Sequence, residues 1–77
     1  NTVELHVELY AREHLKSLID YIRAQGGKIN LVDYNSSYAN SGLSVYTINM
    51  VSWCKNPSLI IKDILNLDYV NFVEILL

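Results

Sequence analysis

The chain has 77 residues, of which 51% are hydrophobic and 18% charged, and its net charge is −2. This length predicts one domain, which buries roughly 60% of the surface that its unfolded chain would expose and gains stability from a partner surface. The absence of a basic run argues against nucleic-acid binding, because phosphate neutralisation carries most of that affinity. No apolar run approaches the ~20 residues that span a bilayer. Cys54 is the only cysteine, which excludes an internal disulfide and a multi-cysteine metal site.

The first half of the chain predicts strand, helix and strand. Residues 2–9 alternate polar and apolar side chains, which indicates a strand with one buried face. A helix follows, and its apolar stripe consists of Leu15, Leu18, Ile19 and Ile22. Gly26 and Gly27 end this helix, since glycine adopts the left-handed conformation at little cost. Residues 28–34 predict a second strand, whose imperfect alternation indicates a bulge or an edge position.

The second half predicts strand, helix and strand again. A polar stretch, residues 35–42, is typical of a hairpin loop, and residues 43–53 are rich in β-forming side chains. Asn56 suits the N-cap of the next helix and Pro57 its first position. The buried stripe of that helix is predicted to be Ile60, Ile61, Ile64 and Leu65. A turn through Asp68 leads to the last strand, residues 70–76.

This βαββαβ order predicts an α+β, ferredoxin-like two-layer sandwich that spans residues 1–77 as a single domain. The expected antiparallel sheet has the order 4-1-3-2, with both helices on one face. The other face is then open. Its middle would carry Glu4, His6 and Glu8, flanked by Thr47, Asn49, Val51, Phe72 and Glu74.

The chemistry-bearing residues predict no enzyme, no catalytic residue and no cofactor. The row Glu4, His6 and Glu8 is a weak candidate for a divalent-cation or pH-sensing site, and a solvated sheet face is the favoured interpretation. Cys54 follows a tryptophan at a strand end and is interpreted as packing. Arg12 alone is too little for the phosphate cradle of a small hydrolase.

Aromatic residues do not indicate RNA binding. The third strand lacks the basic and aromatic pattern by which RNA-recognition domains stack bases, and the first strand offers carboxylates instead. Tyr34, Tyr38 and Tyr46 gather near the second hairpin, where half-buried packing is favoured over a recognition patch. The run Asn35-Ser36-Ser37 matches the N-glycosylation pattern and is interpreted as loop chemistry.

Hydrophobic spacing across nearly the whole chain resembles the ACT domain, a small regulatory module. The resemblance rests on Leu15-x-x-Leu18-Ile19-x-x-Ile22, Gly27-x-Ile29 and, at the end, Leu67-x-x-Val70-x-x-Val73-x-Ile75. Many ACT domains bind an amino acid through a glycine-containing first loop. The loop from Tyr10 to Leu15 has no glycine, so no ligand residue is carried over to this chain.

Among ACT-like domains, the chain is most similar to the soluble C-terminal domain of MgtC/SapB-family membrane proteins, through its Val-Glu-Leu-x-Val opening strand and the missing ligand glycine. The first residue is Asn1 rather than Met, so we expect a piece of a larger protein, and the resemblance implies the C-terminal part of a membrane protein. The resemblance implies a regulatory domain on the cytoplasmic face of the membrane, linked to magnesium homeostasis and virulence. It would act by self-association, as a dimer for example, or by binding another protein domain. The alternative is an ACT-type module that senses an amino acid or a divalent ion and regulates an attached enzyme.

Overall fold

A computed structural model describes residues 2–76. Its elements follow the expected order: β1 (Thr2–Leu9), α1 (Leu15–Ala24), β2 (Lys28–Tyr34), β3 (Ser44–Val51), α2 (Pro57–Leu65) and β4 (Val70–Leu76). Two short 3-10 helices, η1 (Arg12–His14) and η2 (Ser36–Tyr38), were not predicted. The third strand is shorter than the predicted residues 43–53, because the chain leaves the sheet after Val51 and packs the half-buried Trp53 against the core.

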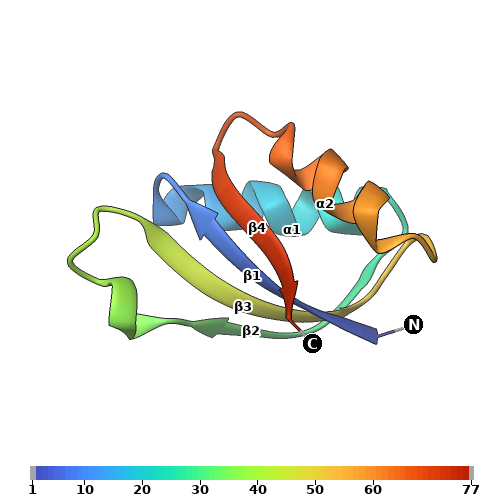
Figure 1. The fold of residues 1–77 in the computed structure, drawn as a ribbon, viewed down its shortest axis with the longest axis horizontal. Helices are drawn as coiled ribbons and strands as arrows, with labels where there is room; N and C mark the ends of the chain where they lie inside the picture. The colour runs from blue at the N-terminus through green and yellow to red at the C-terminus, as the bar shows by residue number, and fades with distance from the viewer. Residues whose placement is uncertain (1, 77) are drawn as a thin grey trace.

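The four strands form one antiparallel sheet in the order β2-β3-β1-β4. This order contains the same neighbours as the expected 4-1-3-2, read from the opposite edge. Figure 1 shows β1 and β3 in the middle of the sheet and both helices on one side of it. The architecture is therefore an α+β two-layer sandwich with an antiparallel sheet, compatible with a ferredoxin-like fold.

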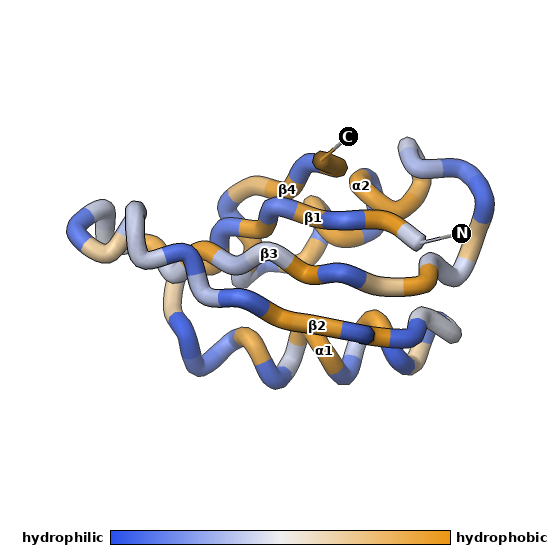
Figure 2. Tube along the Cα trace, turned by 90° about the horizontal axis from the view of Figure 1, so that it is seen from below, coloured by the Kyte–Doolittle hydropathy of each residue, from blue (hydrophilic) through white to orange (hydrophobic). Residues whose placement is uncertain are grey.

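The core lies between the sheet and the two helices. Across the sheet, Ile48 of β3 faces Leu5 of β1 on one side and Val32 of β2 on the other. The helices cover this layer with fully or almost fully buried side chains, which are Leu18 and Ile22 from α1 and Ile60 and Ile64 from α2. Figure 2 shows the sheet from its uncovered side, with the helices behind it.

Two positions of the predicted helix stripes are wrong. Leu65 is 43% exposed, because it lies on the flank of α2 rather than on the side that faces the sheet. Ile19 is only half-buried, and Tyr21 is the residue of α1 that packs against the core instead. Tyr21 meets Trp53 edge-on, with ring centroids 6.3 Å apart.

Both predicted helix boundaries are confirmed by their local geometry. Gly26 has a φ of 102° just after α1, the left-handed conformation that favours glycine. At Gly27 a Cβ atom would lie 2.7 Å from Cγ2 of Ile22, so only glycine allows this close approach. Before α2, the Asn56 side chain accepts a hydrogen bond of 3.0 Å from the Ser58 amide, and Pro57 occupies the first turn.

Among residues 2–76, none of the helices has the length and apolar character that a bilayer crossing requires.

Candidate interaction surfaces

The sheet face opposite the helices, here called the outer face, carries the residues predicted for it. Strand register places one row of side chains across the sheet, in which Thr47, His6 and Glu74 are direct neighbours. The next row holds Asn49, Glu4 and Leu76 in the same way. Val51 pairs with Thr2 and Phe72 with Glu8, so the expected placement of Val51 and Phe72 on this face is also confirmed. The predicted residues therefore share one open surface.

Glu8 is the best-bound carboxylate of the outer face. One of its oxygens lies 2.9 Å from Nε2 of His6, and the other accepts a 2.9 Å hydrogen bond from the Asn71 side chain. Asn71 reaches Glu8 because the β1–β4 register shifts at this point, which leaves Asn71 as an extra residue in β4. Both carboxylate oxygens of Glu8 are therefore bound by side chains of the sheet, His6 and Asn71.

One end of the outer face is covered by η2. The ring of Tyr38 lies 5.6 Å from the ring of His6, centroid to centroid. Val45 faces the same side as Glu8 and is fully buried, although α1 and α2 cover the opposite face. The η2 segment, which contacts β3, supplies that cover. The outer face is thus closed near Tyr38 and open toward Glu4 and Leu76.

The three tyrosines near the second hairpin do not form one patch. Tyr34 and Tyr46 pack edge-on against each other at 5.6 Å, and their register places them on the helix side of the sheet. Tyr38 lies on the outer face. The predicted half-buried packing is wrong for Tyr34 and Tyr38, which are 55% and 37% exposed, and Tyr46 is buried more fully than predicted, at 7% exposed. Asn35 caps η2 by accepting a 3.1 Å hydrogen bond from the Ser37 amide, in agreement with loop chemistry for Asn35-Ser36-Ser37.

The remaining candidates from the sequence are the candidate cation site on β1, Cys54 and Arg12. Within residues 2–76, no three His, Cys, Asp or Glu side chains are grouped so that they could hold a metal ion, and the row Glu4, His6 and Glu8 is not an exception. Cys54 is half-buried, packs against the core and points its sulfur at the Asn56 carbonyl, 3.5 Å away. Arg12 begins η1 in the first loop and is exposed.

The two edges of the sheet differ in how open they are to pairing. The edge strand β2 carries a bulge at Asn30 and the charged residues Lys28 and Asp33, features that discourage pairing with another strand. Residues 72–76 of β4 keep an unbroken register with β1, and Glu74 is their one charged residue. The β4 edge is therefore the better template for an added strand.

An apolar flank of α2 accompanies the β4 edge. Pro57, Ile61 and Leu65 recur every four residues and so line one side of the helix. Pro57 lies beside Ile75 of β4, whereas Asp63, on the opposite side of α2, is close enough to α1 to affect Tyr21. We call Ile61, Leu65, Phe72 and Ile75 the β4–α2 edge. The helical spacing of Pro57, Ile61 and Leu65 is the sequence signal that could have predicted this surface. The signal was missed because Leu65 was predicted to be part of the core.

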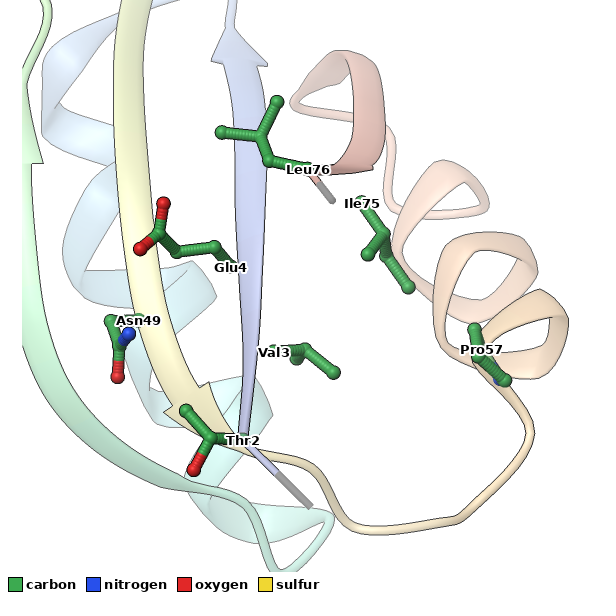
Figure 3. Close-up of a pocket in the computed structure, with 7 residues that line it drawn as sticks. All are labelled: Thr2, Val3, Glu4, Asn49, Pro57, Ile75 and Leu76. Carbon is green, nitrogen blue, oxygen red and sulfur yellow. The ribbon is translucent and has the colours of Figure 1, made fainter.

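A groove of about 490 Å³ is lined by Thr2, Val3 and Glu4 of β1 together with residues of β3, α2 and β4. Figure 3 shows Glu4 and Asn49 on the β3 side of this groove and Val3, Ile75 and Pro57 on the α2 side. Its lining is mainly apolar and holds one carboxylate, that of Glu4. The groove can accept an apolar side chain at the junction of the outer face and the β4–α2 edge.

Tyr21 on α1 and Tyr69 in the turn between α2 and β4 have raised pKa values. Burial is the larger cause for both, because it disfavours the charged phenolate. The carboxylate of Asp63 adds to the rise of the pKa of Tyr21, and that of Asp68 to the rise of the pKa of Tyr69. These phenols thus stay neutral at a pH at which tyrosines of an unfolded chain ionise.

We expect this pair to make the fold sensitive to alkali. The unfolded chain loses these protons near the ordinary pKa of 10.0, at a lower pH than the folded chain does. The contribution of the two phenols to the free energy of unfolding is therefore complete below that pH, and it decreases as the pH rises through the raised pKa values. Urea unfolding between about pH 8 and pH 11 measures this fall. Over this pH range, the free energy of unfolding should decrease less in the variant Tyr21→Phe/Tyr69→Phe than in the control Tyr10→Phe, in which an exposed tyrosine is replaced. An equal fall in both would contradict this origin.

Comparison of the chain with protein-family models, with curated proteins and with solved structures finds no match.

Proposed function

We propose that this chain is a non-catalytic interaction domain that self-associates through the β4–α2 edge. The observation that carries the proposal is the juxtaposition of an unpaired strand and an apolar helix flank. Three of the side chains that border this edge are large, apolar and about two-fifths exposed: Leu65 at 43%, Phe72 at 41% and Leu76 at 38%. Exposed apolar side chains gathered beside a free strand edge are typical of a protein interface.

The partner in this proposal is a second copy of the chain. Antiparallel pairing of two β4 strands about a two-fold axis would continue the sheet from one copy into the other. A pairing centred on Val73 places Glu74 of each copy beside Phe72 of the other and keeps the two carboxylates apart. A pairing centred on Glu74 would oppose two like charges, which destabilises a strand pair. The charge pattern of β4 thus favours one register.

The resemblance of the chain to ACT-like domains supports a regulatory role for this association. We propose that the domain belongs to a larger membrane protein of the MgtC/SapB kind and lies on the cytoplasmic face, where pairing would bring two parent chains together. The ligand-sensing alternative would use the groove beside Glu4. We rank it second, because that groove offers a single charged side chain.

Sedimentation of the 77-residue chain over a wide concentration range tests the proposal. We expect the average mass to rise reversibly from that of one chain toward that of two, since the association joins identical surfaces. A mass that stays at that of one chain up to millimolar concentration would contradict self-association. A mass that rises without a plateau at two chains would contradict the closed two-fold arrangement.

A further inference from the structure

Another cavity, of about 290 Å³, is lined by Arg12, Tyr34, Ser44 and Tyr46. Strand register pairs Ser44 with Leu9, and Tyr46 with Val7. Both partners are fully buried, so these two lining residues face the helix side of the sheet. Tyr34 joins them from β2, and Arg12 begins η1 just after the end of β1. Ligand sites usually have volumes of ~300–1,000 Å³, so a cavity of this size fits a small molecule.

The side chains that line this cavity are all hydrogen-bond donors. Arg12 offers a planar guanidinium with a permanent positive charge, and the other three offer hydroxyl groups. Of the described residues that line the cavity, none is an Asp or a Glu. Asp33 precedes Tyr34 in the chain but pairs with Thr47 on the outer face, so the sheet lies between its carboxylate and the cavity. The cavity therefore favours an anion, although the whole chain has a net charge of −2.

Tyr46 brings an unused hydroxyl to the cavity from a packed position. The residue is 7% exposed and belongs to the core, yet its hydroxyl forms no hydrogen bond within residues 2–76. In this part of the chain no fully buried side-chain oxygen or nitrogen lacks a partner, so the hydroxyl of Tyr46 reaches the solvent, through the cavity that it lines. Arg12 likewise forms no ion pair among the described residues. A phenylalanine would pack in the same way as Tyr46, so the core does not account for this hydroxyl, whereas a ligand in the cavity would use it.

We propose that this cavity binds a small molecule through a phosphate group. The guanidinium of Arg12 would hold two phosphate oxygens as a bidentate pair, and the hydroxyls of Ser44 and Tyr46 would donate to the phosphate. The exposed ring of Tyr34, which meets Tyr46 edge-on at 5.6 Å, would cover the rest of the molecule. A phosphate monoester carries a charge of about −1.5 to −2 at pH 7, so one fixed cation attracts it more strongly than it attracts a carboxylate. An amino acid fits less well, because the described lining offers its ammonium group no carboxylate.

Titration of the 15N-labelled 77-residue chain with phenyl phosphate, in a buffer free of phosphate, tests this site. We expect saturable shifts of the amide signals of Arg12, Ser44 and Tyr46, with a Kd of about 1 mM. The signals of Leu59 and Phe72 should not move. Benzoate has the same ring and a single negative charge and should bind more weakly, and benzylamine should cause no shift. Binding of benzoate as tight as that of phenyl phosphate would contradict phosphate recognition. The absence of saturable shifts up to tens of millimolar would overturn the site.

Matched single variants separate a defined site from general attraction to cations. Arg12→Gln removes the charge and should weaken the binding of phenyl phosphate about tenfold. Tyr46→Phe keeps the packing, removes only the hydroxyl and should weaken binding about three- to tenfold. The controls are Arg23→Gln, in the last turn of α1, and Tyr38→Phe, on the outer face, and each should change binding by less than about twofold. Equal weakening by the variants and their controls would overturn the proposal.

This site is separate from the surface proposed for self-association. The cavity lies at the β2 edge, and β4 forms the opposite edge of the sheet. The variant Leu65→Glu/Phe72→Glu, in which we expect copies not to pair, should therefore bind phenyl phosphate as tightly as the parent chain. A loss of binding in this variant would contradict a site contained in one chain.

Discussion

Replacing Ile48 by alanine is expected to lower the free energy of unfolding by about 2–5 kcal/mol. Ile48 is fully buried in a central strand and lies between Leu5 and Val32, so its truncation leaves a cavity that the sheet cannot close. A domain of this length has a total stability of about 4–12 kcal/mol. The variant should therefore unfold at a urea concentration at which the parent chain is still folded.

Urea unfolding followed by the fluorescence of Trp53 measures this loss. Leu59→Ala is the control, because Leu59 is 47% exposed on α2 and should cost less than about 1 kcal/mol. Both variants are compared at one protein concentration, since association would add to the apparent stability. A loss at Ile48 no larger than the loss at Leu59 would show that the core does not lie between the sheet and the helices.

Placing glutamate at both Leu65 and Phe72 is expected to abolish self-association. A two-fold interface contains each residue twice, so the double variant removes four apolar side chains and adds four negative charges, two of them beside Glu74 of the other copy. At about 1 kcal/mol for each partly buried side chain, the dimer should weaken by roughly two to three orders of magnitude. Sedimentation should then show single chains at concentrations where the parent chain is paired.

The matched control places the same charges elsewhere. Leu59 and Leu31 are also exposed leucines, one on α2 and one on the other edge strand, β2. The variant Leu59→Glu/Leu31→Glu should keep the parent's association constant. If this control dissociates as fully as Leu65→Glu/Phe72→Glu, the loss reflects added net charge, and the assignment of the interface to the β4–α2 edge is wrong.

The fold could be predicted from the sequence where the signals are local. Alternation in residues 2–9 fixes which side of β1 is buried, and the two faces follow for every strand that pairs with it. Gly26 and Asn56 mark helix ends by their own backbone and side-chain chemistry. The imperfect alternation of residues 28–34 correctly indicated both an edge strand and a bulge, which lies at Asn30.

What sequence reasoning missed depends on packing between distant segments. Leu65 continues the apolar spacing of α2, and only the position of the helix over β4 shows that it flanks the edge rather than the core. Tyr38 was grouped with Tyr34 and Tyr46 by proximity in the chain, yet η2 folds onto the outer face and places it on His6. The groove beside Glu4 is lined by residues of β1, β3, α2 and β4, a combination that spacing within one strand does not reveal.

The most direct test of the proposed association is a nuclear Overhauser measurement on a mixture of labelled and unlabelled chains, filtered for contacts between different copies. Pairing through the β4–α2 edge should give backbone contacts between copies around Val73, together with contacts from the Leu65 methyl groups to the other copy. Contacts between copies that arise from β2 or from the outer face, with none from β4, would contradict the account.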